Sequence, residues 1–152
     1  MNLRQGRGGQ GGQGGQRGQG GPLRHGSATP VEAARQRLGR QVEELARRRL
    51  QLRGLLLLQC NYRAPGGEID IIARDGDTLV FVEVRCRSGG AAGGAAASVD
   101  ARKRARIVRA ARHFLCAAGA AWAQSPCRFD VVAVDGPRWR WIRGAFDAAG
   151  CA

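Results

Sequence analysis

The chain has 152 residues, 24 of them Gly, and its 25 basic and 12 acidic residues give a formal net charge of +13. A chain of this length suits one domain with a modest core, and no apolar run approaches the roughly 18 residues that a membrane span needs. Five cysteines without a C-x-x-C pair argue against a disulfide framework and a zinc ribbon, so we expect a reduced, soluble, cytoplasmic protein whose charge attracts polyanions such as nucleic acid.

Residues 1–28 are rich in Gly, Gln and Arg and contain no acidic residue. Such a composition cannot bury enough apolar surface to offset the entropy of the chain, so it predicts a disordered tail. An R-G-G element at 7–9 could contact RNA without specificity, but a passive tail is the simpler interpretation. We expect the folded domain over residues 29–152, and the tail lacks the apolar stretch of a secretory signal.

Helical periodicity begins after Thr29 and Pro30, which form a cap followed by proline in the first turn. Apolar residues then recur at helical spacing, and they are Leu38, Val42, Leu45, Ala46, Leu50 and Leu52. The pattern predicts an amphipathic helix over 31–53, which Gly54 ends.

Strand and helix signals alternate along the rest of the chain. Short apolar runs bounded by turn residues are typical of strands, and helical periodicity returns after a Gly- and Ala-rich loop at 88–97. The predicted elements are a helix over 31–53, strands over 55–62, 67–74 and 78–87, a helix from 98 or 100 to 118, and strands over 128–135 and 138–143. The order α-β-β-β-α-β-β predicts one α/β domain with a mixed central sheet flanked by helices.

The second and third strands flank Asp75 and Gly76, a strong signal for a β-hairpin. If these two residues form the loop, Asp70 pairs with Phe81 and lies diagonal to Glu83. One face of the hairpin is then apolar, and the opposite face gathers three carboxylates and a guanidinium. These side chains are Glu68, Asp70, Glu83 and Arg85.

Two interpretations of this acidic face remain open. In one, the face is solvated, or its carboxylates pair with nearby arginines. In the other, carboxylate oxygens hold Mg²⁺ or Mn²⁺, and the phosphate of a substrate fills the remaining positions. Gathering three carboxylates on one face raises the free energy of the fold through their mutual repulsion, unless a cationic group joins them.

Several motifs, in order and at compatible spacing, resemble one known family. They are G-E-I-D-I-I at 67–72, V-F-V-E-V-R at 80–85, G-x-x-x-E-x-x-A at 39–46, the segment 94–99 with Lys103, and R-F-D-V-V at 128–132. Over about residues 38–147 the chain resembles the YraN family of small, largely uncharacterised bacterial proteins.

That family is similar to the PD-(D/E)XK nuclease superfamily, in particular to Holliday-junction resolvases with a restriction-endonuclease-like fold. The resemblance implies that Asp70 and Glu83 are catalytic acids that hold Mg²⁺ or Mn²⁺ together with Glu43. Arg85 stands at the position of the catalytic lysine, and Glu68 supports the acids without binding the metal. The implied reaction is hydrolysis of a phosphodiester bond, of DNA rather than RNA.

The residues themselves also favour Glu43. It lies in line with Gly39, Ala46 and Leu50 at the border of the apolar stripe, so it can point toward the sheet. The alternative is a surface ion pair on the helix.

Arginine in place of the superfamily's lysine is a departure from the pattern. A guanidinium stays protonated at any working pH, so Arg85 can clamp a phosphate but cannot readily act as a base. A second interpretation is therefore a non-catalytic nucleic-acid-binding module of the same fold with a degenerate metal site. A third is a structural protein whose acids are merely ion-paired.

The second predicted helix is strongly basic. Its Arg102, Arg106 and Arg109 share a stripe that fits a surface following phosphates, although an ordinary solvated face has the same pattern. Lys103, the only lysine of the chain, matches the family pattern as a phosphate contact. Resolvase-like proteins often act as dimers, so the resemblance also leaves a homodimer open.

Overall fold

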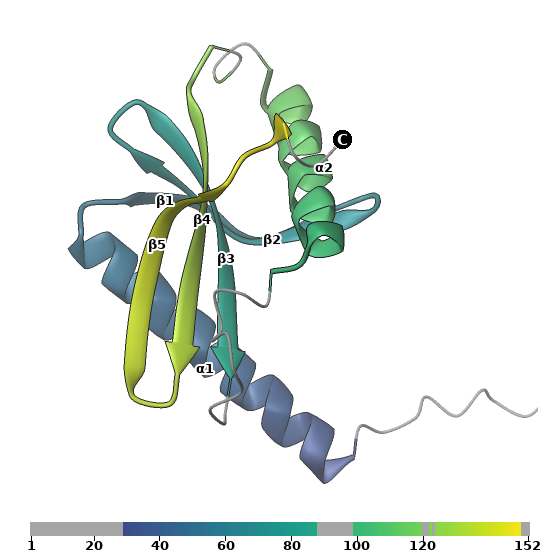
Figure 1. The fold of residues 1–152 in the computed structure, drawn as a ribbon, viewed down its shortest axis with the longest axis vertical. Helices are drawn as coiled ribbons and strands as arrows, with labels where there is room; N and C mark the ends of the chain where they lie inside the picture. The colour runs from purple at the N-terminus through teal and green to yellow at the C-terminus, as the bar shows by residue number, and fades with distance from the viewer. Residues whose placement is uncertain (1–28, 88–98, 120–121, 123, 150–152) are drawn as a thin grey trace, which may run out of the picture.

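The computed structural model describes residues 29–87, 99–119, 122 and 124–149. Its elements are α1 (Pro30–Leu52), β1 (Leu56–Ala64), β2 (Gly67–Asp75), β3 (Thr78–Arg87), α2 (Ala101–Ala118), β4 (Cys127–Asp135) and β5 (Arg138–Phe146) (Figure 1). This succession confirms the predicted order α-β-β-β-α-β-β. The predicted tail at 1–28 and the loop at 88–97 lie outside the described residues.

The five strands form one sheet in the order β1-β2-β3-β4-β5. Neighbouring strands are antiparallel except for β3 and β4, which are parallel. A parallel pair needs a long crossover connection, and α2 lies within the connection between these two strands. The predicted mixed sheet is therefore confirmed, with β1 and β5 at its edges.

The two helices cover opposite faces of the sheet (Figure 1). On one face, α1 packs on a cluster that includes Val80 and Val82 of β3. On the other face, α2 packs on a cluster that includes Phe81 of the same strand. Successive residues of β3 thus alternate between two cores, as the geometry of a strand requires.

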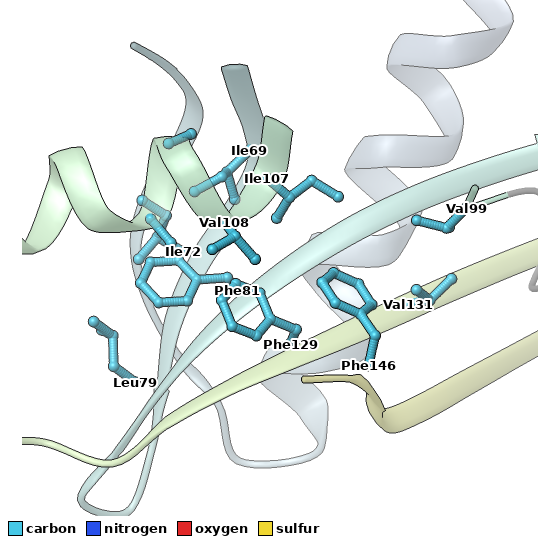
Figure 2. Close-up of a cluster of buried hydrophobic side chains, with 12 residues drawn as sticks. Ile69, Ile72, Leu79, Phe81, Val99, Ile107, Val108, Phe129, Val131 and Phe146 are labelled. Atoms are coloured by element: carbon cyan, nitrogen blue, oxygen red, sulfur yellow. The ribbon is translucent and has the colours of Figure 1, made fainter. Parts of the chain in front are cut away.

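Aromatic rings fill the core beneath α2. The ring centroids of Phe81 and Phe129 lie 5.4 Å apart, and those of Phe129 and Phe146 lie 5.0 Å apart, both in stacked arrangements (Figure 2). Ile107 and Val108 of α2 reach this cluster from above. The stack joins β3, β4 and β5 on the side of the sheet that also carries Glu83.

The buried stripe of α1 differs from the predicted one. Val42, Ala46 and Leu50 are buried, whereas Leu38 and Leu45 are 46% and 39% exposed. Residues spaced by four lie along one ridge of a helix, and this ridge is the one that packs against the sheet.

Neither helix of the described residues is long and apolar enough to cross a membrane.

The β2–β3 hairpin has a different loop from the predicted one. Asp75 pairs with Thr78, so the two loop residues are Gly76 and Asp77. Gly76 has φ +60°, which matches a turn that needs glycine at its first central position rather than its second. The shift moves the register by two residues, so the paired side chains stay on their predicted faces. Ile69, which precedes the paired part, does not, because it packs in the core beneath α2 and not on the face of Ile71.

Asp130 anchors the β4–β5 edge of the sheet. This residue is fully buried, and its carboxylate accepts hydrogen bonds from Arg128 Nε at 2.9 Å, Trp141 Nε1 at 2.9 Å and the Gly144 N–H at 2.9 Å. The Gly144 bond spans the irregularity in the β4–β5 register, so the side chain replaces a backbone partner there. Arg128 also binds Asp75 at 2.9 Å.

Replacing Asp130 by Ala should destabilise the protein by about 2 to 5 kcal/mol, because it leaves the N–H donors of Trp141 and Gly144 without their acceptor and Arg128 with Asp75 as its remaining acidic partner. The free energy of unfolding would be measured by urea titration. Asp77→Ala, at the exposed turn, is the matched control and should change stability far less. Equal losses in the two variants would contradict the anchoring role of Asp130.

Candidate functional site

The candidate site lies where β2 separates from β3. The recorded pairs of this hairpin end at Ile71 with Val82, and Asp70 is the next residue on β2. Its carboxylate oxygen Oδ2 accepts a hydrogen bond of 2.7 Å from the N–H of Val84. The Asp70 side chain thus satisfies a backbone donor of β3 that β2 no longer pairs.

The corrected register changes how the two acids face each other. With Asp70 paired to Phe81, as the sequence predicts, Asp70 would lie only diagonal to Glu83. In the observed register Ile72 pairs with Phe81 and Ile71 with Val82, so Asp70 lies beyond the last pair and its carboxylate binds the Val84 N–H instead. The charge of Asp70 raises the pKa of Glu83, so the two carboxylates are within electrostatic reach of each other.

Glu83 is the most unusual side chain of the site. It is 2% exposed, and its oxygen Oε2 is buried without a hydrogen-bond partner. Its other oxygen, Oε1, lies 3.2 Å from Lys103 Nζ and 3.4 Å from Arg85 Nε. The structure thus brings Asp70, Glu83 and Arg85 together, as the sequence predicts, while their roles stay predictions.

Lys103 joins the acids from the first turn of α2. Asp100 caps this helix by accepting a hydrogen bond of 2.7 Å from the Lys103 N–H, which fixes the turn. The Lys103 side chain is only 15% exposed, and its Nζ also lies 3.4 Å from Glu68 Oε1. The resemblance implies that Lys103 contacts a phosphate, which stays a prediction, and in the structure its ammonium group lies beside Glu68 and Glu83.

Burial raises the pKa of both central acids, because an ionised carboxylate loses its hydration there. For Glu83 the charge of Asp70 raises the pKa further, the charges of Lys103 and Arg85 lower it, and the result is a pKa of about 7. For Asp70 the hydrogen bond from Val84 opposes the rise. Glu83 can therefore exchange a proton near neutral pH.

Glu43 lies at the border of this site, on α1. Partial burial raises its pKa, and the charge of Asp70 raises it further, which shows that the two acids are within electrostatic reach. No described contact joins Glu43 directly to Asp70 or Glu83. The neighbouring Glu44 is turned away and pairs with Arg47 and Arg48, as expected for a solvated position.

The donor set fits a hard divalent cation held by few protein ligands. In the described part of the chain, no three His, Cys, Asp or Glu side chains converge as a ready-made metal-binding group. Mg²⁺ is commonly bound through one or two carboxylates, with water and substrate phosphate in the remaining positions. Asp70 and Glu83 could hold such an ion, and Glu83 Oε2 is a buried acceptor that it would satisfy.

Two of the three arginines predicted on α2 lie in a cavity beside Glu68. Arg102, Arg106 and Arg109 are exposed. Arg106 and Arg109 line a cavity together with Glu68 and with Arg63 of β1, a residue that the sequence does not single out. Only the fold brings β1 against α2, so no local signal marks Arg63.

Comparisons with known proteins place the chain among close relatives. The family described as Uncharacterised protein family UPF0102 matches residues 42–134, a segment that contains Glu43, Asp70, Glu83 and Lys103. A UPF0102 protein of Ectopseudomonas mendocina (strain ymp) is 52% identical over 114 residues, which cover 73% of the chain and 95% of the relative. One of Pseudomonas aeruginosa (strain LESB58) is 50% identical over 126 residues, 79% of the chain and 99% of the relative. One of Paracidovorax citrulli (strain AAC00-1) is 50% identical over 137 residues, 84% of the chain and 98% of the relative.

Replacing Glu83 by Gln tests the raised pKa. Because folding raises this pKa from 4.5 to about 7, the folded state keeps a proton that the unfolded state loses between these values. The stability that the neutral carboxyl contributes is complete below pH 4.5 and is lost as the pH rises to about 7. In EDTA, the stability gained from Glu83→Gln should therefore be larger at about pH 8 than at about pH 4.5, by on the order of 3 kcal/mol.

The measurement is urea unfolding of both proteins, followed by circular dichroism at a series of pH values. Glu44→Gln serves as the control, since Glu44 is partly exposed and its pKa is lowered by Arg48 and Arg47. A stability difference between wild type and Glu83→Gln that stays constant across this pH range would show that Glu83 ionises normally.

Proposed function

Because the chain belongs to the uncharacterised protein family UPF0102, as the YraN resemblance predicts, we propose its function from the site itself. It binds nucleic acid and hydrolyses phosphodiester bonds of DNA with the help of Mg²⁺ or Mn²⁺. The observation that carries this proposal is Glu83, a carboxylate that is 2% exposed and has an oxygen without a hydrogen-bond partner. It lies near a second, partly buried acid, Asp70, and is contacted by Lys103 from the first turn of the basic helix α2.

A buried acid close to a second, partly buried one is costly for a fold. Desolvation and mutual repulsion both disfavour their ionised forms, and the raised pKa of Glu83 expresses that cost. Strongly shifted carboxylates gather at functional sites, where their charge or their proton is used. In a chain of net charge +13, an acidic cluster close to exposed arginines suits a phosphate that arrives together with a divalent cation.

The metal would supply charge neutralisation on the phosphate and a lowered pKa for a water molecule. The chain's own residues supply the positioning. The Val84 N–H fixes the Asp70 carboxylate, and the central strand β3 fixes Glu83. Arg85 follows Glu83 by two residues on the same face of β3, and its planar guanidinium can bind the phosphate through two parallel hydrogen bonds.

Lys103 adds a compact donor that Arg85 does not provide. An ammonium group is a point charge on a flexible stem with three rotatable N–H donors, whereas a guanidinium is a rigid planar fork. Lys103 Nζ lies 3.2 Å from Glu83 Oε1, so this group is placed to orient the attacking water by hydrogen bonding. A lysine on α2 thus stands in space near where the superfamily pattern expects one on β3.

A non-catalytic nucleic-acid-binding module is the second candidate function. The observation in its favour is that Lys103 and Arg85 already bring two positive charges to Glu83. Such pairing could hold the acid in place without a metal, and the basic surface of α2 would still bind phosphates.

Cleavage by the full-length chain tests the proposal directly. We expect labelled single-stranded, duplex, flapped or four-way DNA to be cut with Mn²⁺ or Mg²⁺ and to stay intact in EDTA. Asp70→Asn keeps an oxygen that can accept the Val84 hydrogen bond but lacks the charge, so its cleavage rate should fall at least about 100-fold. Asp77→Asn, in the exposed turn, should cut normally.

Two other outcomes of this assay are informative. Equal cleavage by wild type and Asp70→Asn would identify a contaminating nuclease and contradict the enzyme. If every DNA and RNA substrate stays intact but a salt-sensitive gel shift persists, the non-catalytic module is the correct function.

Lys103→Ala should lower the cleavage rate about 100-fold while DNA binding in EDTA changes little, because the lysine acts on the reacting groups. Lys103→Arg should fail to restore the rate, since a planar guanidinium does not reproduce the position and donor geometry of the ammonium group. Arg102→Ala, one residue away on the exposed face of α2, is the control for a simple loss of charge. Full activity of Lys103→Arg would show that only the positive charge matters.

A further inference from the structure

A basic cavity adjoins the acidic site where the β1–β2 turn meets α2. Its volume is about 380 Å³, and it is lined by Arg63, Ala64, Gly66, Gly67, Glu68, Arg106 and Arg109. Three guanidiniums from two separate elements therefore face one hollow, and only one carboxylate lies among them. Neither helix periodicity nor strand alternation alone would bring these arginines together.

The two glycines allow this hollow to form. A Cβ on Gly67 would lie 2.1 Å from the carbonyl oxygen of Arg106, so only glycine lets the turn approach α2 this closely. Gly66 has φ +80°, and its carbonyl accepts a hydrogen bond of 3.2 Å from Arg109 Nη2. The turn is thus held against the helix, and it sets Arg63 beside Arg106 and Arg109.

The charge balance of the cavity favours an anion. Its one carboxylate, Glu68, is already shared with Lys103 Nζ at 3.4 Å. In the described ranges, no carboxylate forms an ion pair with Arg63 or Arg106. Planar guanidiniums that converge on one space match the oxygens of a phosphate, which they can bind through paired hydrogen bonds.

The cavity and the acidic site share a wall. Glu68 lines the cavity and precedes Asp70 by two residues, while Arg106 follows Lys103 by one turn of α2. An anion in the cavity therefore lies next to a phosphate at Asp70 and Glu83. A nucleic-acid strand is a polyanion that presents phosphates at regular intervals, so one strand can fill both places.

We propose that Arg63, Arg106 and Arg109 form a subsite for a backbone phosphate adjacent to the one at Asp70 and Glu83. The subsite fixes the position of the strand and so determines which bond is presented to the acids. This inference rests on the proposed nucleic-acid function and adds to it where the strand lies. Phosphate contacts of this kind set register without reading sequence.

The test is Arg63→Gln/Arg106→Gln in the full-length chain. Both side chains are exposed and make no ion pair in the described ranges, so the fold should be retained, as thermal unfolding would verify. Binding of a fluorescent DNA is measured in EDTA by anisotropy over a series of salt concentrations. Losing one phosphate contact should lower the slope of log affinity against log salt by about 1 and weaken binding about tenfold at 0.1 M salt.

Arg35→Gln/Arg37→Gln is the matched control, because it removes the same charge from exposed positions on α1. Its salt slope should stay close to that of the wild type. The cavity variant should also cut end-labelled DNA in Mn²⁺ at a wider spread of positions. Equal slopes for the cavity variant and the wild type, or an equal loss in the control, would overturn the subsite.

The possible results distinguish a failure of the phosphate subsite from a failure of the proposed nucleic-acid function. If the wild type binds no nucleic acid in EDTA or with metal, the proposed function fails and the subsite fails with it. If the wild type binds and the cavity variant binds identically, only the subsite is wrong.

Discussion

The separation of β2 from β3 at Asp70 is the constraint on which both functional regions depend. Up to Ile71 the two strands pair, and beyond it β2 pairs only with β1 and runs toward α2, where Gly67 contacts the Arg106 backbone. The Asp70 carboxylate takes the Val84 N–H that the separation would otherwise leave without a partner. The separation of these two strands therefore places Asp70 at the open end of the hairpin. It also brings the β1–β2 turn against α2, so the acidic site and the basic cavity arise from the same feature.

Two buried acids on neighbouring strands show how structural and functional roles differ. Asp130 accepts hydrogen bonds at both carboxylate oxygens from Arg128, and further bonds from Trp141 and the Gly144 N–H, so it is satisfied within the fold. Glu83 is equally buried, yet its Oε2 has no hydrogen-bond partner. A fold that needs a buried carboxylate for stability saturates it with donors, as at Asp130. An unsaturated one is better explained by a ligand that arrives from outside.

The sequence predicts the element order, the mixed sheet and the faces of the paired hairpin side chains, because strand periodicity and turn residues are local signals. It fails where geometry is not local. The loop residue that takes a positive φ shifts the register by two, and the pairing of β2 with β3 ends before Asp70, so Ile69 packs in the opposite core from Ile71. The contact of Lys103 with Glu83, and the approach of Arg63 to α2, depend on how the crossover helix lies on the sheet. No spacing in the sequence encodes that placement.

The two oxygens of Glu83 bear on whether the site is catalytic or degenerate. If Lys103 and Arg85 occupied both, a divalent cation could bind only by displacing an ion pair, and the arrangement would favour the non-catalytic module. They contact Oε1 alone, while Oε2 has no hydrogen-bond partner. A cation held at Oε2 would leave Lys103 in place, and its charge would offset the repulsion between Asp70 and Glu83 that raises the Glu83 pKa. The free Oε2 therefore supports the proposed hydrolysis over the non-catalytic module, even with arginine at position 85.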